Sequence, residues 1–355
     1  MQNKLLEATK NILEKNMEIV KSPFCDKKVV LVYDKDSKLS VLIWEAYAQN
    51  LSENSPLIQR RGVGGEGVEI IIFSESTNKK QLQDFLMSLE ENSTVILVQS
   101  TNFRLDNFRI RLNLKNIWVW CLEHNHLWYM KDNQIENYID AIEYNTPYYE
   151  WLSDFLKEKI GSADSMEMKT KDWNTLKATG WFDDLKRNTW DYTDKYRWGT
   201  FPIWENFTEV MDFDKLEWSF SVYAYPDMSF QVQFCDPFVV KIEKSMLSCD
   251  DPKCPEWFRN LLNQIESWED WEVMVRELGF WMNLWISKAK KLSDVNAFER
   301  VSGFHISLWK KHQIFRKKIH RKVTQRFHID IFPDVQSISF DWEKVYENWK
   351  YLFTQ

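Results

Sequence analysis

Two histidines and an aspartate in the last third of the chain have the spacing of metal ligands. His328 and Asp330 lie two residues apart on an expected strand, so both side chains point to one face of it. His305 lies on a second apolar strand, Gly303–Leu308. A buried histidine among hydrophobic residues is usually a satisfied part of the core. Here, however, two such strands are close in sequence, and one of them also carries a carboxylate.

Two glutamates earlier in the chain extend this group to two imidazoles and three carboxylates. Glu205 lies in the stretch 200–208, and Glu277 lies in the stretch 275–283. Such a donor set suits a pair of divalent cations of hard to borderline character. The candidate metal ligands are Glu205, Glu277, His305, His328 and Asp330.

Three other groups of residues are better explained by structure than by chemistry. The loop Gly62–Gly67 precedes a strand, whereas a dinucleotide-binding loop follows a strand and opens a helix. Cys249 and Cys254 have no second pair of Cys or His nearby, which argues against a zinc site. His124 and His126 could bind a metal together, but without carboxylates beside them we expect a satisfied loop pair.

The charge balance argues against nucleic acid and membrane partners. The 355 residues include 46 Lys and Arg against 53 Asp and Glu, a formal net charge of −7. The dense basic run Lys310–Lys322 could bind nucleic acid, but in an acidic chain we expect a solvated loop or edge. The apolar runs are too short to span a bilayer. We therefore expect a cytoplasmic protein.

The first half of the chain alternates apolar strands with helices, which predicts a doubly wound parallel sheet. The expected strands are Lys28–Tyr33, Val68–Phe73, Ser93–Gln99 and Asn116–Leu122. The expected helices are Leu5–Val20, Ser37–Asn50, Lys79–Leu89 and Gln134–Ile160. The short polar segment Gly161–Thr170 then reads as a linker.

The second half alternates apolar and polar residues in long stretches, which predicts mostly antiparallel strands. The expected strands are Phe220–Ile242, Glu272–Phe280, Gly303–Leu308, Arg326–Phe332 and a terminal hairpin; the expected helices are Pro255–Glu266 and Asp294–Val301. The predicted fold is an α/β domain with a parallel sheet at residues 1–165. An α+β domain with mostly antiparallel strands, at residues 166–355, would bind the metal.

The composition holds too little glycine and too much tryptophan. The chain has 9 Gly and 19 Trp, whereas ordinary usage near 7% predicts about 25 Gly. Several Trp stand where turns call for glycine, as in Asn348-Trp349, which would become the hairpin signal Asn-Gly. A genetic code in which UGA means glycine, read with the standard table, produces this pattern. The candidate positions are 190, 198, 204, 218, 281, 285, 309, 342 and 349.

Read with glycine at these positions, four stretches resemble the thermophilic-type metallo-aminopeptidases, the aminopeptidase T and aminopeptidase S family. They follow in the family's order, and in three of them a family glycine meets a Trp. The stretches are Trp198–Thr208, Arg276–Asn283, Ser302–Trp309, and His328–Asp330 with the hairpin Asp341–Trp349. The N-terminal half matches the family only in its general α/β character.

The resemblance implies a metallo-aminopeptidase, a hydrolase with two divalent ions (zinc, cobalt or magnesium) that removes N-terminal residues from peptides. It implies the five metal ligands given above, with Glu299 as a weaker candidate, and a homodimer. Either Glu205 or Glu277 would take a proton from the attacking water. The family has a Tyr seven residues after His305, a partner of the transition-state oxyanion, where this chain has His312.

The role of His312 and the class of protein both remain open at the level of the sequence. His312 could donate the same hydrogen bond, could ligate a metal, or could mark a lost activity. A non-catalytic relative would use His312 and the basic run to hold a partner. A truly Trp-rich chain would fit a carbohydrate-binding protein or a glycosidase, with Glu205 and Glu277 as acid and base.

Overall fold

The structure is a computed structural model of the 355-residue chain. It describes residues 1–16, 28–53, 68–103, 105–106, 108–143, 146–188, 198–203, 205–229, 231–268, 272–301, 303–309 and 328–353. Within these ranges, no helix has the length and apolar character needed to cross a membrane.

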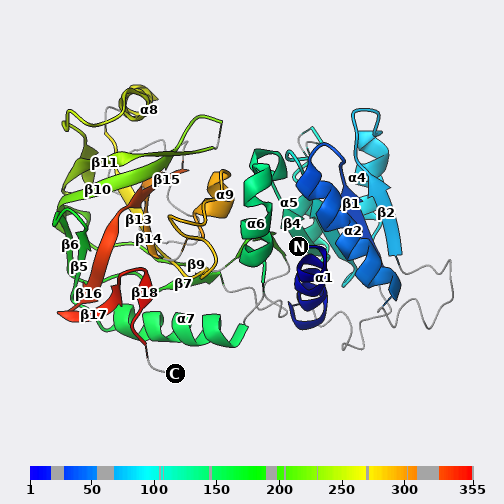
Figure 1. The fold of residues 1–355 in the computed structure, drawn as a ribbon, viewed down its shortest axis with the longest axis horizontal. Helices are drawn as coiled ribbons and strands as arrows, with labels where there is room; N and C mark the ends of the chain where they lie inside the picture. The colour runs from blue at the N-terminus through cyan, green and yellow to red at the C-terminus, as the bar shows by residue number, and fades with distance from the viewer. Residues whose placement is uncertain are drawn as a thin grey trace. The chain divides into compact units, whose positions relative to one another are not determined.

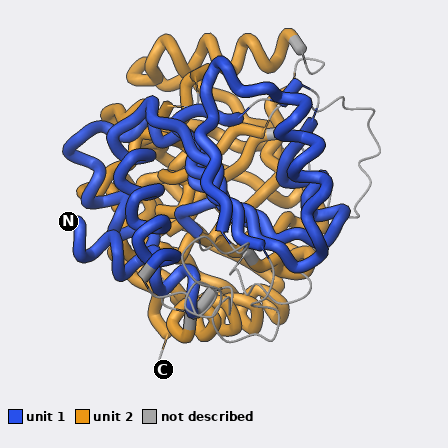
Figure 2. The backbone as a smooth tube through the Cα atoms, turned by 90° about the vertical axis from the view of Figure 1, so that its right-hand side faces the viewer, with its two compact units in different colours: residues 1–145, 190–203 blue, residues 146–189, 204–355 orange. Residues whose placement is uncertain are grey.

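The chain forms two compact units, each built from two separate stretches (Figure 2). Unit 1 comprises Met1–Asn145 and Trp190–Ile203, and unit 2 comprises Thr146–Thr189 and Trp204–Gln355. An α/β unit with a parallel sheet and a mostly antiparallel unit with helices confirm the predicted fold class. The domain boundary at residue 165 stays a prediction of the sequence.

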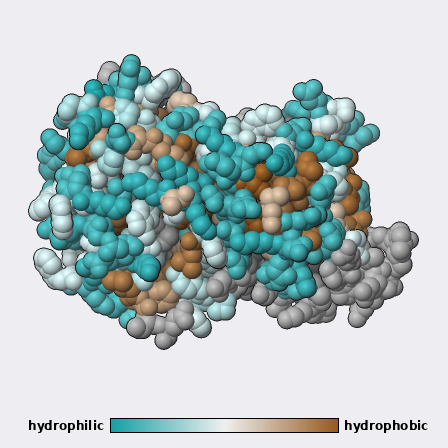
Figure 3. All heavy atoms as spheres, viewed as in Figure 1, coloured by the Kyte–Doolittle hydropathy of each residue, from teal (hydrophilic) through white to brown (hydrophobic). Residues whose placement is uncertain are grey.

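Unit 1, in which Figure 1 labels β1, β2 and β4, contains a parallel sheet. Its five strands follow the order β2-β1-β3-β4-β8. The strands are β1 (Val29–Tyr33), β2 (Val68–Ile72), β3 (Thr94–Val98), β4 (Trp120–His124) and β8 (Trp198–Phe201). Every residue of β1 and β3 is buried, as expected for central strands covered on both faces. The edge strand β2 leaves Ile70 and Ile72 exposed, and hydrophobic surface is visible on this unit in Figure 3.

The helices of unit 1 alternate with these strands along the chain. They are α1 (Gln2–Asn11), α2 (Lys38–Glu53), α4 (Lys79–Met87), α5 (Ile110–Asn116) and α6 (Ile135–Ala141), with a short π-helix at Ile12–Asn16 and 3₁₀ helices at Leu127–Tyr129 and Asp132–Gln134. Asn78 caps α4 by accepting a hydrogen bond from the Gln81 amide. His124, at the end of β4, is buried between two tyrosines and bonds to the hydroxyls of Tyr47 and Tyr138 at 2.9 and 3.0 Å. This pairing agrees with the expectation that His124 is a satisfied residue.

Unit 2 contains a large sheet in which all the strand pairs are antiparallel. Its main path runs β18-β17-β16-β5-β6-β10-β15-β14-β13-β9-β7, and β11 and β12 extend it from β10. The first strands are β5 (Ser165–Thr170), β6 (Thr175–Thr179), β7 (Lys186–Asn188), β9 (Glu205–Thr208), β10 (Leu216–Pro226), β11 (Val232–Glu243) and β12 (Met246–Ser248). The later strands are β13 (Val275–Trp281), β14 (Gly303–Trp309), β15 (His328–Pro333), β16 (Val335–Phe340), β17 (Glu343–Glu347) and β18 (Lys350–Tyr351). The helices are α7 (Thr146–Gly161), α8 (Glu256–Trp268) and α9 (Val295–Phe298), with a 3₁₀ turn at Phe213–Lys215.

Two local expectations are wrong. The segment 161–170 is not a linker, because Ser165–Thr170 forms β5 and buries every second residue. The single helix expected at Gln134–Ile160 is two helices, α6 and α7. Pro147 falls in the first turn of α7, where a missing N–H is tolerated, and so marks a helix start.

Tryptophan is frequent among the residues that adopt a left-handed backbone. Of twelve described non-glycine residues with positive φ, five are tryptophan. They are Trp118 (φ 59°), Trp173 (66°), Trp218 (95°), Trp342 (74°) and Trp349 (67°). This confirms that several Trp, including Trp349, occupy positions suited to glycine. Trp309, another of the candidate positions, is instead the last residue of strand β14.

Two of these tryptophans complete tight hairpin turns. Asp341 and Trp342 link the paired residues Phe340 and Glu343, and both have positive φ. Asn348 and Trp349 link Glu347 and Lys350 in the same way. Two-residue turns with positive φ at both positions are the turns that favour Asp-Gly and Asn-Gly.

Candidate metal centre

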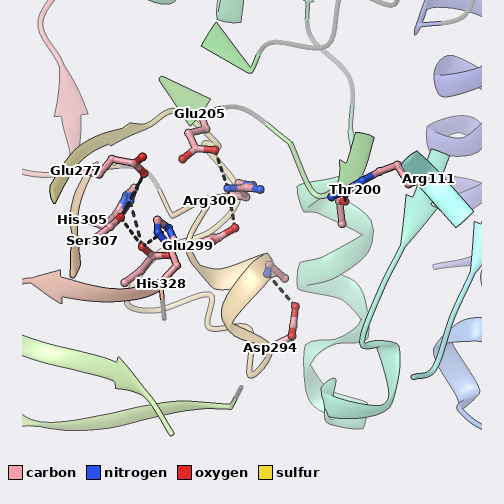
Figure 4. A network of polar contacts seen from close by, with 12 residues as sticks. Arg111, Thr200, Glu205, Glu277, Asp294, Glu299, Arg300, His305, Ser307 and His328 are labelled. Atoms are coloured by element: carbon pink, nitrogen blue, oxygen red, sulfur yellow. Dashed lines mark hydrogen bonds and ion pairs between the residues drawn. The ribbon is translucent and has the colours of Figure 1, made fainter. Parts of the chain in front are cut away.

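The candidate ligands come from four neighbouring strands of unit 2, namely β9, β13, β14 and β15 (Figure 4). In the register of these strands, Gly279 lies opposite His305 and Glu277 lies opposite Ser307. Ser307 in turn lies opposite Asp330 on β15. The strand pairing therefore brings side chains that are far apart in sequence to one patch of the sheet.

Glu205, Glu277 and His305 form a buried group that can hold a metal ion. One ligand atom from each lies within 4.8 Å of the others. The exposed fractions of the three residues are 8%, 4% and 0%. Two carboxylate oxygens and an imidazole nitrogen are suitable ligands for a divalent cation, and burying them without one is costly.

Asp330 and His328 extend this group on the next strand. Asp330 Oδ1 lies 3.6 Å from His305 Nε2 and 3.2 Å from His328 Nε2. Asp330 is buried, whereas the side chain of His328 is 38% exposed. The two imidazoles thus meet at one carboxylate oxygen, one from the interior and one from the surface.

Ser307 lies at the centre of these groups. Its Oγ is 2.6 Å from Asp330 Oδ1, 3.2 Å from Glu277 Oε1 and 3.0 Å from His305 Nε2. A hydroxyl has one proton to donate, so it cannot satisfy both carboxylates at once. Within the described residues, Glu277 Oε2 and His305 Nδ1 are buried and have no hydrogen-bond partner. A cation at this point would be bound by the lone pairs of these acceptor atoms, so the residues present fit a metal ion.

Arg300 links Glu205 to one further carboxylate, that of Glu299. Its Nη1 lies 3.1 Å from Glu205 Oε2 and 2.8 Å from Glu299 Oε1. Glu299 and Arg300, which come shortly before strand β14, therefore both reach the site, although the sequence indicated only Glu299 there. The guanidinium supplies a fixed positive charge beside the ligands.

Burial and charge shift the pKa values of three carboxyl groups here. Burial raises the pKa of Glu205, against the effect of the Arg300 charge. Burial also raises the pKa of Glu299 well above its usual value. Burial acts in the same sense on Asp330, but the charges of His328 and His305 and the hydrogen bonds from His328 and Glu299 outweigh it, and the pKa of Asp330 lies well below its usual value. Asp330 is thus the carboxylate kept ionised beside the two imidazoles.

Gly279 is required by the position of His305. A Cβ atom built on Gly279 would lie 1.6 Å from His305 Cε1 and 2.1 Å from Nδ1. Any side chain at residue 279 would therefore displace the imidazole. Strand β13 thus holds the metal-site histidine by leaving a gap for its ring.

The five ligands expected from the sequence lie together in this arrangement. His312 and the basic run Lys310–Lys322 lie outside the described residues. Sequence reasoning did not single out Ser307 or Arg300. Ser307 could have been found, because it lies two residues after His305 on one strand and shares its face.

Comparison with known proteins gives a structural match. No protein family model matches the chain, and no curated protein matches it. The chain is similar to the solved structure of a 2,5-dihydroxypyridine dioxygenase from Pseudomonas putida KT2440, with a TM-score of 0.63 and 14% identity. The match covers 100% of this chain and 99% of that chain. At this identity, the likeness shows that the two proteins share a fold.

This match corrects the function expected from the sequence. Assignment to the aminopeptidase family is wrong, and so are peptide hydrolysis and the hydrolase class, because the matching fold belongs to a dioxygenase and no family model supports a peptidase. The carbohydrate-binding and non-catalytic alternatives are set aside with them. The four stretches that resembled the aminopeptidases contain the candidate metal ligands and the strands that carry them. Ligands of these types serve both hydrolysis and oxygen chemistry, so they do not identify the reaction. The homodimer stays a prediction.

Proposed function

We propose that the chain is a metal-dependent dioxygenase in which His305, His328 and Asp330 hold one non-haem iron(II) ion. The observation that carries this proposal is the meeting of both imidazoles at Asp330 Oδ1, at 3.6 and 3.2 Å. Two histidines and one carboxylate, with open positions opposite, are the donor set of non-haem iron(II) oxygenases. The fold shared with a dioxygenase supports the same chemistry.

The separations of the ligand atoms favour a common ion. Ligands at roughly 2.0–2.2 Å from one ion lie about 3 Å apart when they occupy neighbouring positions. The two contacts of Asp330 Oδ1 are close to that value before any adjustment of the side chains. Strand register fixes these positions, because Asp330 pairs with Ser307 and His328 pairs with Trp309.

When bound, an iron(II) ion with open positions supplies the redox chemistry for adding dioxygen to an aromatic ring. The protein's own residues orient the metal ligands and bind the substrate. Ser307 holds Asp330 by donating its hydroxyl proton to Oδ1. Arg300 offers a positive charge for an anionic oxygen of the substrate, and Glu277 Oε2 is an acceptor facing the same site.

A second candidate is a two-ion centre. It is favoured by the group Glu205, Glu277 and His305, whose ligand atoms lie within 4.8 Å of one another. In this arrangement Glu205, Glu277 and His305 would hold one ion, and His328 and Asp330 would hold the other. Zinc, cobalt or magnesium would suit the first, carboxylate-rich position.

Anaerobic titration with iron(II), followed by calorimetry, separates these candidates. We expect one ion per chain, with an affinity that falls at least tenfold in His328→Ala and much less in Glu205→Gln. His126→Asn, a histidine replacement at a left-handed position of unit 1, is the matched control and should bind as the parent does. Two ions per chain, one of them lost in Glu205→Gln, would support the second candidate. Unchanged binding by His328→Ala would refute the iron triad.

Oxygen uptake tests the reaction itself. Protein purified from the organism that carries the gene should consume oxygen with 2,5-dihydroxypyridine or another dihydroxylated aromatic ring, and only with iron(II) present. Iron binding without oxygen uptake on any such ring would refute the dioxygenase assignment while leaving the metal centre in place.

A further inference from the structure

An indole ring fills the space beside the candidate metal ligands. Trp281 shares one face of β13 with Gly279 and Glu277, two and four residues earlier, and pairs with Glu205 on β9. Its ring centroid lies 4.5 Å from that of His305. The side chain is fully buried, at 0% exposure.

The same indole also contacts a cation. The guanidinium carbon of Arg300 lies 4.4 Å from the ring centroid of Trp281. The indole thus contacts an imidazole that can bind a metal and a fixed positive charge. A metal-binding imidazole and a cation are also the neighbours expected of an aromatic substrate, because a cation over the face of an aromatic ring attracts that ring.

The indole is poorly matched to its surroundings as a permanent core residue. Trp281 Nε1 is buried and has no hydrogen-bond partner within the described part of the chain. Buried tryptophans usually place this N–H on an acceptor, because an unpaired buried donor is destabilising. The ring therefore fills the space without satisfying its own polar atom.

Other tryptophans stand in places that suit glycine. Five have positive φ, and Trp342 and Trp349 complete turns in which glycine is the preferred residue. Trp173, Trp218 and Trp342 are 79%, 54% and 87% exposed. With only 9 Gly in 355 residues, the chain carries tryptophan in the role of glycine at several independent positions.

We propose that residue 281 of the functional protein is glycine and that the space filled by the Trp281 indole is the binding pocket for a planar aromatic ring. The pocket lies between the His305 imidazole and the Arg300 guanidinium. It therefore selects a flat ring that carries an anionic or hydroxyl oxygen, which Arg300 and the metal would both attract. This inference rests on the proposed function for its substrate class, but its geometry is independent of the metal.

Indole itself is the probe for this pocket. It has the shape of the removed side chain, and it carries no oxygen ligand for a metal. Trp281→Gly should bind indole at least tenfold more tightly than the parent chain, measured by calorimetry and by the rise in melting temperature. Catechol should compete with indole, whereas cyclohexanol, which is not planar, should not. Trp218→Gly removes an exposed indole from the same unit and is the matched control; it should bind no indole.

The outcomes separate the pocket from the proposed function. A folded Trp281→Gly chain that binds iron(II) but no planar ring would overturn the pocket and leave the metal centre standing. Indole binding without iron binding would support the pocket and refute the proposed function. If Trp281→Gly and Trp281→Ala both fail to fold, the indole is a structural part of the core and the inference is wrong. The gene offers an independent check, because a UGA codon at position 281 supports the inference and UGG overturns it.

Discussion

Replacement of Trp342 by glycine should make the protein more stable. Trp342 is the second central residue of the β16–β17 turn, with φ 74°, and is 87% exposed. An L-residue in the left-handed region costs about 1–2 kcal/mol, which glycine avoids. The indole buries only about 30 Å² of surface, worth about 0.8 kcal/mol at roughly 25 cal/mol per Å². The expected net gain is therefore about 0.2–1.2 kcal/mol.

Thermal unfolding and urea unfolding measure this gain. For a domain of 150–250 residues, about 1 kcal/mol shifts the melting temperature by roughly 2–4 °C, so we expect a rise of up to about 5 °C. Trp151→Gly is the matched control, because Trp151 is exposed but lies inside helix α7. Glycine within a helix should lower stability by about 0.5–1 kcal/mol. Equal losses of stability in both variants would refute the strain argument for Trp342.

Three further predictions follow from buried groups. Gly279→Ala should lower metal affinity at least tenfold in a calorimetric titration, because its Cβ would overlap His305; unchanged affinity would show that the ring moves aside freely. Burial lowers the pKa of His124 from 6.5 to about 3, so only the unfolded chain gains a proton between these values. Stability should be complete above pH 6.5 and fall by up to about 5 kcal/mol towards pH 3, and urea unfolding of His124→Gln should lack this part of the pH dependence. Glu209→Ala should cost about 3–5 kcal/mol in the same assay, since it leaves Arg276 buried without the carboxylate 3.2 Å away; a loss below about 1 kcal/mol would contradict this.

Local sequence pattern predicted most of the elements that form the two sheets. Val29–Tyr33 and Thr94–Val98 are continuous apolar runs, and both are buried central strands of the parallel sheet. The terminal hairpin was also predicted correctly, because Asn348-Trp349 marks its turn once the Trp is read in the place of glycine. These features depend on short-range periodicity and turn geometry, which are visible in a single sequence.

Long-range pairing explains what the sequence did not predict. Strand β8, at Trp198–Phe201, pairs with β4 in unit 1, although the chain on both sides of Trp190–Ile203 belongs to unit 2. Four residues carry too little pattern to reveal such an insertion. The polar segment 161–170 suggested a linker, yet Ser165–Thr170 pairs with both β6 and β16, because half of its residues are apolar or small enough to be buried.

The candidate site was predictable in its residues but not in its reaction. The spacing of His328 and Asp330, and the apolar strand around His305, identified two histidines whose Nε2 atoms lie 3.6 Å (His305) and 3.2 Å (His328) from Asp330 Oδ1. Nothing in that spacing distinguishes hydrolysis from oxygen chemistry, since both use histidine and carboxylate ligands. The charge of Arg300 and the filled space at Trp281 became visible only once the strands were paired.

The most direct test of the central claim is a crystal structure of the protein soaked with manganese(II), an oxygen-stable substitute for iron(II), with anomalous scattering used to locate the ion. We expect one strong peak bound by His305, His328 and Asp330. A peak held by Glu205 and Glu277 without His328, or no peak at the site, would contradict it.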